Sequence, residues 1–357
     1  MKELQAILSK IAQFAPGEKA ILATVVGVVG SGYRRPGARM LIDKNGFSIG
    51  TVSGGCLEAD VLERAKRVLE TNEATVITYD TTADENSVFG LSMGCRGIVR
   101  ILLEPIDKES DFFEFLSFCL NQRASGNVAT LIDSNVGNLK IGWRLFENEF
   151  KDLLNNSPIE KILGIENLPE NPPTVVNSVV GEVFFETIIP PLNLLLFGAG
   201  YDALPLIKFA KELGWRVSVI DHRAAYANAE RIPEADEIIV AASENLDEDL
   251  FNDENSVAVI MTHNYDRDRE ILRRLLRSKC RYIGALGPKK RTKNLLEEIG
   301  ETFGAEQLQR LYAPVGLDIG ADTPEEIALA VVAEISAVLS RRNGGFLREC
   351  EGSIYNK

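Results

Sequence analysis

Apolar residues in the first half of the chain recur mainly at the spacing of β-strands, interrupted by stretches with the spacing of helices. The predicted strands are 20–30, 75–80, 97–105, about 127–133, 138–143 and 181–187, with a hairpin over 38–53 that turns at Asn45-Gly46. The predicted helices are about 3–14, about 56–69 and 111–122. This pattern predicts a mixed α+β domain.

Strands and helices alternate regularly in the second half. The predicted strands are 193–198, 216–221, 235–241, 256–262 and 281–287, and the predicted helices are 203–213, 266–278 and 288–300. A last helix has a clear start, because Thr323 and Glu326 form a capping box around Pro324. The alternation predicts an α/β fold with a Rossmann-like, doubly wound parallel sheet.

The length of the chain and a proline-rich junction predict two domains. A chain of 357 residues exceeds the usual size of a single hydrophobic core. Ile189-Pro190-Pro191 marks the boundary. We therefore expect an N-terminal domain over 1–190, a C-terminal domain over 191–345 and a tail over 346–357.

Composition excludes several classes of protein. A formal charge of −13 repels phosphate backbones, so we expect no nucleic-acid partner. No stretch approaches the roughly 18 apolar residues of a membrane span, and the charged N-terminus is unlike a signal peptide, so we expect a cytoplasmic protein. Five cysteines without a CxxC pair and two histidines indicate neither a disulfide framework nor a metal site.

A glycine-rich loop after the first strand of the second domain is typical of dinucleotide binding. Gly198, Gly200 and Ala203 form the pattern G-x-G-x-x-A between a strand and a helix, and the amides at such a helix start bind anions. Asp221 ends the next strand, where a carboxylate accepts hydrogen bonds from ribose. The alternative is a vestigial loop, since Asp202 places a negative charge where a phosphate would lie.

Two further groups lie at strand ends that face the ligand crevice of such a sheet. Arg223 follows Asp221 and is a candidate contact for a phosphate or a nucleobase. His263 follows the fourth strand and is a candidate acid, base or ligand-facing donor. The alternative for this second segment is structural, with Asn264 and Asp266 capping the following helix.

A second glycine pair precedes a cysteine in the first domain. Cys56 follows Gly54 and Gly55 and is predicted to lie in the first turn of a helix, where the helix dipole favours a thiolate. Glu58 and Asp60 oppose that effect. The alternative is a small thiol packed under a glycine turn.

Three blocks of sequence resemble the XdhC/CoxI family of xanthine dehydrogenase and carbon monoxide dehydrogenase accessory proteins. They are GSGYRRPGARM (30–40) with GTVSGGCLE (50–58), GCRGIVRILLEP (94–105), and the second domain with LLLFGAGYDALPL, VIDHR, MTHNYDRD and APVGLDIGADTPEEIALAVVAEI. The likeness is weakest at about 107–180, which we treat as a variable insertion. Tyr201 and Asp202 depart from the family's usual histidine and apolar residue.

The resemblance implies a maturation factor without turnover of its own. Such a chaperone binds molybdenum cofactor as molybdopterin or its dinucleotide form, protects it during sulfuration and delivers it to apo xanthine dehydrogenase or a related molybdenum hydroxylase. A cysteine desulfurase is the other implied partner. Cys56 and Cys95 are then candidates for contact with the cofactor's head group or for sulfuration. Arg34 and Arg35 are candidate anion contacts, with solvated loop charges as the alternative.

Two other functions stay open at this point. The second domain alone would suit an NAD(P)-dependent oxidoreductase, although His263 is its one visible proton-relay candidate. A scaffold that joins apoenzyme and desulfurase without binding a cofactor is the third possibility. We also expect a homodimer.

Overall fold

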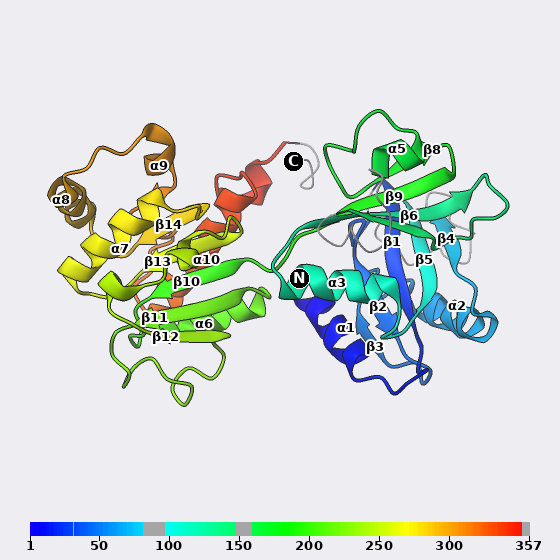
Figure 1. The fold of residues 1–357 in the computed structure, drawn as a ribbon, viewed down its shortest axis with the longest axis horizontal. Helices are drawn as coiled ribbons and strands as arrows, with labels where there is room; N and C mark the ends of the chain where they lie inside the picture. The colour runs from blue at the N-terminus through cyan, green and yellow to red at the C-terminus, as the bar shows by residue number, and fades with distance from the viewer. Residues whose placement is uncertain (31, 81–96, 148–158, 352–357) are drawn as a thin grey trace. The chain divides into compact units, whose positions relative to one another are not determined.

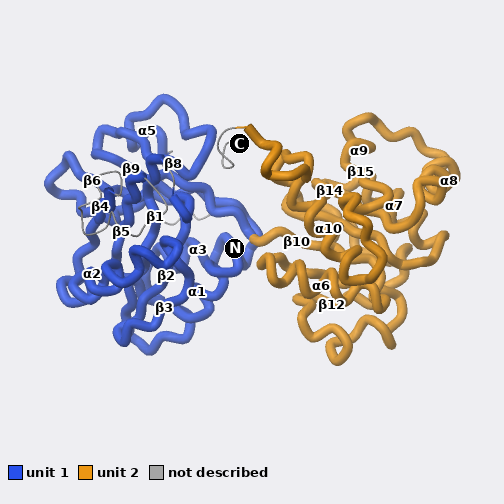
Figure 2. The backbone as a smooth tube through the Cα atoms, turned by 180° about the vertical axis from the view of Figure 1, so that it is seen from behind, with its two compact units in different colours: residues 1–190 blue, residues 191–357 orange. Residues whose placement is uncertain are grey.

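The computed structural model describes residues 1–30, 32–80, 97–147 and 159–351. The chain forms two compact units, Met1–Pro190 and Pro191–Lys357, which Figure 2 colours separately. Within the described residues, no helix has the length and apolar character needed to cross a membrane.

Unit 1 combines short helices with antiparallel strands. Its helices are α1 (Lys2–Ala12), α2 (Glu58–Thr71), α3 (Asp111–Asn121) and α5 (Ile159–Leu163). Its strands are β1 (Ala20–Gly30), β2 (Arg39–Ile42), β3 (Ser48–Gly50), β4 (Thr75–Asp80), β5 (Gly97–Ile106), β6 (Gly126–Ser134), β7 (Arg144–Glu147), β8 (Thr174–Ser178) and β9 (Gly181–Ile188). They form two sheets, in the orders β3-β2-β1-β5-β4 and β7-β6-β9-β8.

The five-stranded sheet is covered by helices on both faces (Figure 1). Successive residues of a strand point to opposite faces. Ile21 and Ala23 of β1 pack with Val61 of α2, whereas Ala20 and Leu22 pack with residues of α1 and α3. Val61, Ala65 and Val68 recur at helical spacing, which is why α2 presents one apolar stripe to the sheet.

Two buried ion pairs connect the two sheets of unit 1. Arg39 of β2 pairs with Glu186 of β9, and Arg144 of β7 donates to Glu104 of β5. The side chains of all four residues are at most 11% exposed. Both guanidinium groups also contact the ring of Phe112, at 5.5 and 3.8 Å from its centroid. The charged groups therefore neutralise one another inside the unit.

Unit 2 is a parallel sheet with helices on both faces, as predicted. Its strands are β10 (Asn193–Phe197), β11 (Arg216–Asp221), β12 (Glu237–Val240), β13 (Ser256–Ile260), β14 (Tyr282–Ala285) and β15 (Leu311–Tyr312). Its helices are α6 (Ala203–Glu212), α7 (Tyr265–Arg277), α8 (Lys289–Ile299), α9 (Ala305–Gln309) and α10 (Pro324–Leu339), with short 3₁₀ turns at Ser243–Asn245, Glu248–Phe251 and Leu347–Glu349. The order β12-β11-β10-β13-β14-β15 is that of a Rossmann fold.

Alternate residues of the central strands build the two cores of unit 2. Leu194 and Leu196 of β10 pack with residues of α6 and α10, whereas Leu195 and Phe197 pack with residues of α7 and α8 (Figure 1). Strands buried on both faces explain the continuous apolar runs in the sequence. The predicted capping box is confirmed, because Thr323 accepts a hydrogen bond from the backbone of Glu326 at 3.3 Å.

One strand prediction in unit 1 was wrong. Residues 138–143 form turns, with backbone hydrogen bonds from Leu139 to Val136 and from Trp143 to Lys140, and the strand begins at Arg144. Gly142 has φ +88°, which a continuous strand does not adopt. The short elements α5, β8, α9 and β15 were not predicted, since two to five residues carry little periodic signal.

Replacing Glu104 by Leu should lower the free energy of unfolding of unit 1 by about 3–5 kcal/mol, because the charge of Arg144 would remain buried without its partner. Urea unfolding followed by the fluorescence of Trp143, in a Trp215→Phe background, measures this loss. The double variant Glu104→Leu/Arg144→Met should recover most of it. A single variant as stable as the parent would show that the pair does not hold the sheets.

Candidate functional site

The glycine loop before α2 is held by the carboxylate of Glu58. This carboxylate accepts hydrogen bonds from the backbone N–H of Ser53 at 2.9 Å and from the hydroxyl of Thr51 at 2.5 Å, and also contacts the hydroxyl of Ser53. The Ser53 hydroxyl oxygen in turn accepts from the N–H groups of Gly55 and Leu57, at 3.2 and 3.1 Å. The loop is therefore fixed by its own side chains.

Glu58 is ionised in this arrangement. Burial raises the pKa of its carboxyl group, but the hydrogen bonds from Ser53 and Thr51 outweigh burial and lower the pKa below its usual value. The helix begins at Glu58, with Leu57 as N-cap. The prediction that Cys56 lies in the first helical turn was wrong, because the chain is still in the loop at Cys56.

Cys56 lies on the surface of unit 1 together with Gly54 and Gly55, all three exposed. Gly55 has φ +102°, a conformation that favours glycine. A Cβ atom on Gly54 would lie 3.1 Å from the ring of Tyr33, so the aromatic ring packs directly on this loop. Tyr33 as a whole is 65% exposed. An accessible thiol and an accessible aromatic face thus lie on neighbouring loops.

The two arginines predicted as anion contacts follow Tyr33 in that neighbouring loop. Arg34 forms an ion pair with Glu3 of α1 in this conformation, and both side chains are partly exposed. Arg35 is exposed. Cys95, the predicted companion of Cys56, lies outside the described residues. The assignment of these residues to a cofactor remains a prediction.

The glycine loop of unit 2 has the local geometry that its sequence predicts. Gly198 has φ +115°, and a Cβ atom there would lie 2.4 Å from the carbonyl oxygen of Met261. Only glycine fits so close to the neighbouring backbone. Ala203 is fully buried at the start of α6, where a small side chain lets helix and sheet approach.

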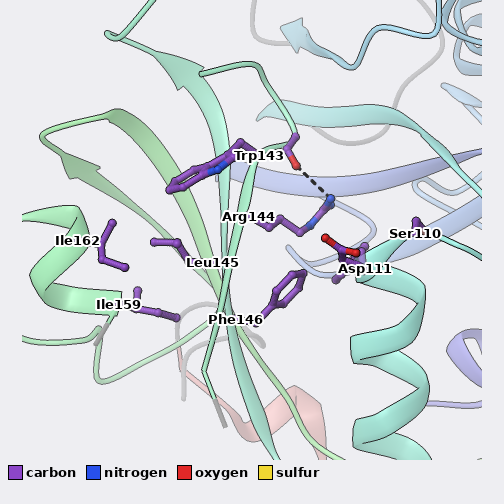
Figure 3. A pocket seen from close by; sticks show the side chains of 10 residues that line it. Ser110, Asp111, Trp143, Arg144, Leu145, Phe146, Ile159 and Ile162 are labelled. Atoms are coloured by element: carbon purple, nitrogen blue, oxygen red, sulfur yellow. Dashed lines mark hydrogen bonds between the residues drawn. The ribbon is translucent and has the colours of Figure 1, made fainter. Parts of the chain in front are cut away.

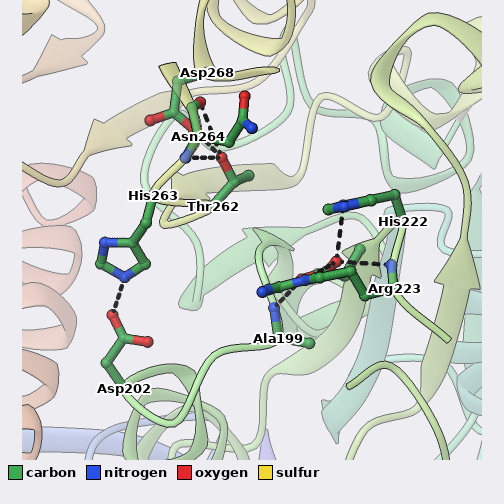
Figure 4. A network of polar contacts seen from close by, with 9 residues as sticks. Ala199, Asp202, His222, Arg223, Thr262, His263, Asn264 and Asp268 are labelled. Atoms are coloured by element: carbon green, nitrogen blue, oxygen red, sulfur yellow. Dashed lines mark hydrogen bonds and ion pairs between the residues drawn. The ribbon is translucent and has the colours of Figure 1, made fainter. Parts of the chain in front are cut away.

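Asp221, the predicted ribose acceptor, is surrounded by donors from the protein. Its carboxylate accepts hydrogen bonds from the backbone N–H groups of Ala199 at 2.8 Å and Arg223 at 2.9 Å. The guanidinium of Arg223 donates to both oxygens, at 3.0 and 2.7 Å, and Nδ1 of His222 lies 3.1 Å away (Figure 4). Asp221 therefore ties the glycine loop to the end of β11.

These contacts also set the charge of Asp221. Burial raises the pKa of this carboxyl group, but the hydrogen bonds from Arg223 and from Ala199 dominate and lower the pKa from 3.8 to about 2. Arg223, a predicted phosphate contact, additionally stacks on Tyr226, with its guanidinium carbon 4.2 Å from the ring centroid. Its guanidinium is thus already engaged on two sides.

His263 contacts a residue that sequence reasoning did not pair with it. Its Nε2 atom lies 2.8 Å from a carboxylate oxygen of Asp202, the residue before α6 (Figure 4). The neighbouring residue Asn264 caps α7 by accepting a hydrogen bond from the N–H of Arg267 at 3.1 Å. The structural interpretation is therefore confirmed for Asn264, whereas a role of His263 toward a ligand remains a prediction. The two partners are 61 positions apart, so local sequence patterns carried no signal for the contact.

A cavity of about 420 Å³ opens beside β7 in unit 1. Figure 3 shows Trp143 and Leu145 on one side of this edge strand, near α5, and Arg144 and Phe146 on the other, near α3. None of the described residues predicted as site residues lines the cavity, whose lining is Ser110, Asp111, Phe112, Gly142, Trp143, Arg144, Leu145, Phe146, Ile159 and Ile162. In the part of the chain that the structure describes, no group of three or more His, Cys, Asp or Glu side chains could hold a metal ion.

Replacing Asp221 by Asn should lower the free energy of unfolding of unit 2 by about 2 kcal/mol at pH 7, because a carboxylate with a depressed pKa stabilises the folded state above its unfolded pKa. The stabilisation is lost as the pH falls from the unfolded pKa towards about 2. Urea unfolding followed by Trp215 fluorescence should show the difference between parent and variant narrowing below about pH 4. A difference independent of pH would contradict this assignment.

Comparisons with known proteins find two matching family models and several similar proteins. It matches the XdhC and CoxI family over residues 14–80 and the XdhC Rossmann domain over residues 194–335. It is 23% identical over 323 residues to the molybdenum cofactor insertion chaperone PaoD of Escherichia coli, covering 90% of this chain and 84% of that protein.

Two further similarities extend over most of the chain. A crystal structure of a xanthine dehydrogenase from Bacillus halodurans has a TM-score of 0.78 and 30% identity, covering 97% of this chain and 98% of that one. A probable xanthine dehydrogenase subunit from Bacillus subtilis is 36% identical over 324 residues, with 89% of this chain and 92% of that protein covered. This chain therefore belongs to the XdhC and CoxI family.

Proposed function

We propose that this protein binds molybdenum cofactor and delivers it to a xanthine dehydrogenase-type hydroxylase during maturation of that enzyme. The observation that carries the proposal is the exposed thiol of Cys56, which lies on a loop fixed by Glu58 and Ser53. A thiol held in place without a ligand loses little conformational freedom when it binds one. The proposed site is therefore organised before the cofactor arrives.

The residues around Cys56 suit the chemistry of this cargo. Thiolates are soft ligands, which suits a molybdenum centre that already carries sulfur ligands. The exposed ring of Tyr33 offers an aromatic face to a planar pterin, and the exposed backbone of Gly54 and Gly55 offers hydrogen bonds without side chains in the way. Arg35 adds a positive charge for the cofactor's anionic tail.

Similarity to known proteins supports the same proposal. PaoD is a molybdenum cofactor insertion chaperone, and the Bacillus subtilis relative is a probable component of xanthine dehydrogenase. Sulfuration with a cysteine desulfurase, a role for Cys95 beside Cys56, action in the cytoplasm and a homodimeric state are further parts of the proposal. Light scattering at twice the mass of one chain would support the dimer, and a monomeric mass would contradict it.

The alternative, an NAD(P)-dependent oxidoreductase, has no comparable support. Asp221 would have to accept hydrogen bonds from ribose, and each of its carboxylate oxygens already accepts at least two from the protein. The contact of His263 with Asp202 engages the candidate proton relay. We therefore do not assign turnover to this chain.

Replacing Cys56 by Ser should impair activation of the partner hydroxylase at least about tenfold, the effect of losing about 1.4 kcal/mol of cofactor binding. The fold should be unchanged, because the Cys56 side chain is exposed. The measurement is hydroxylase activity after anaerobic incubation of the apoenzyme with cofactor-loaded parent or variant.

Cys350 offers a matched control, since it is another exposed cysteine and lies outside the proposed site. Cys350→Ser should activate the hydroxylase as well as the parent does. If Cys56→Ser activated the hydroxylase fully, the thiol of Cys56 would not be needed for delivery of the cofactor. An equal loss in both variants would point to general damage to the protein instead.

A further inference from the structure

The carboxylate of Asp202 occupies the space beside Gly200. A Cβ atom placed on Gly200 would lie 2.4 Å from Oδ1 of Asp202. In dinucleotide-binding loops, the second glycine lacks a side chain so that the pyrophosphate can approach the backbone. Here the chain's own carboxylate approaches Gly200 instead. The space beside Gly200 is therefore taken by an internal anion.

His263 holds this carboxylate in place from the end of the neighbouring strand. Its Nε2 atom lies 2.8 Å from Oδ2 of Asp202, and the two side chains come from separate loops (Figure 4). His263 has φ +56°, a conformation that few residues other than glycine adopt. The residues beside it are anchored, because Thr262 contacts Asp268 and Asn264 caps α7. The backbone that carries the imidazole is therefore fixed, and the contact with Asp202 orients the ring.

The charge of Asp202 opposes any phosphate at this position. Asp202 is the N-cap residue of α6, but its side chain makes no capping hydrogen bond. A carboxylate at a helix N-terminus is stabilised by the helix dipole, which is the same feature that would attract a phosphate. Two anions cannot share this place without strong repulsion, since the side chain of Asp202 is only 22% exposed and weakly screened.

Another group that would bind a dinucleotide already has hydrogen-bond partners within the protein. The carboxylate of Asp221 accepts from Ala199 and Arg223. A cavity lined by Asp221, Ser243 and Leu246 measures about 20 Å³. That volume holds about one water molecule. The carboxylate beside Gly200 and the protein donors on Asp221 thus both oppose a bound dinucleotide.

We propose that Asp202, positioned by His263, is a specificity residue that closes the glycine loop of unit 2 to ligands bearing a pyrophosphate. NAD(P) and the dinucleotide form of molybdenum cofactor are excluded from this loop by the same carboxylate. This exclusion concerns unit 2 alone and holds whether or not unit 1 binds the cofactor.

The test is a calorimetric titration of the full-length protein with inorganic pyrophosphate at low ionic strength. The parent should show no saturable binding in the millimolar range. Asp202→Ser, which removes both the charge and the bulk beside Gly200, should bind pyrophosphate at least about tenfold more tightly than the parent. Glycine tolerates the positive φ at position 263. His263→Gly should therefore also bind pyrophosphate more tightly than the parent, because Asp202 loses the contact with the imidazole that holds its carboxylate beside Gly200.

Asp266→Ser is the matched control. It removes the same charge from the first turn of α7, at a side chain that is 81% exposed. This variant should behave like the parent. An equal gain in Asp266→Ser would assign the effect to net charge and overturn the proposal.

The proposal would also be overturned if the parent bound pyrophosphate as tightly as Asp202→Ser does. Circular dichroism melting verifies that each variant is folded. If Asp202→Ser does not fold, the titration of His263→Gly is the deciding measurement. If His263→Gly binds pyrophosphate no better than the parent, the proposed role of Asp202 and His263 is refuted.

Discussion

Backbone N–H groups in a tight loop need acceptors, and both glycine loops of this chain meet that need with carboxylates of their own. Glu58 accepts from the backbone of Ser53 in unit 1, and Asp221 accepts from the backbone of Ala199 in unit 2. In each case the hydrogen bonds lower the pKa of the carboxyl group and keep it ionised. The loops are therefore ordered by the protein and do not depend on a ligand for their conformation.

The two loops differ in what they leave accessible. In unit 1, Glu58 lies on the inner side of the loop and Cys56 remains exposed beside the ring of Tyr33. In unit 2, Asp202 fills the space beside Gly200 and is engaged by His263. The first arrangement suits a site that receives a soft metal centre, whereas the second suits a loop that rejects a pyrophosphate. The two glycine loops thus differ in the groups that they leave accessible to a ligand.

The fold of unit 2 could be predicted closely from the sequence, because strands buried on both faces alternate with amphipathic helices and leave a strong periodic signal. The same signal placed Gly198 directly after β10 and Asp221 at the end of β11, but it did not show the protein donors that surround Asp221. Unit 1 was less predictable where its elements are short: β7 and β8 have four and five residues. The start of α2 was misplaced because the apolar pattern reaches back to the buried N-cap residue Leu57, whereas the helix begins at Glu58.

Contacts between distant positions account for what else the sequence could not show. Arg34 pairs with Glu3, Asp202 meets His263, and Arg144 reaches Glu104 across two sheets. Each depends on the finished fold, whereas a sequence pattern describes only neighbours within a turn or a hairpin. The sequence identified charged residues as candidates for ligand binding. Whether such a charge is available to a ligand depends on its partner in the folded protein, which the sequence did not show.

The most direct test of the central claim is the stoichiometry of pterin bound to the protein. Molybdenum cofactor is mixed anaerobically with the full-length chain, the protein is separated by gel filtration, and the pterin that coelutes is oxidised to its fluorescent form and quantified. A cofactor chaperone should retain close to one pterin per chain. Protein that elutes without pterin, although it binds NADH tightly, would contradict the account.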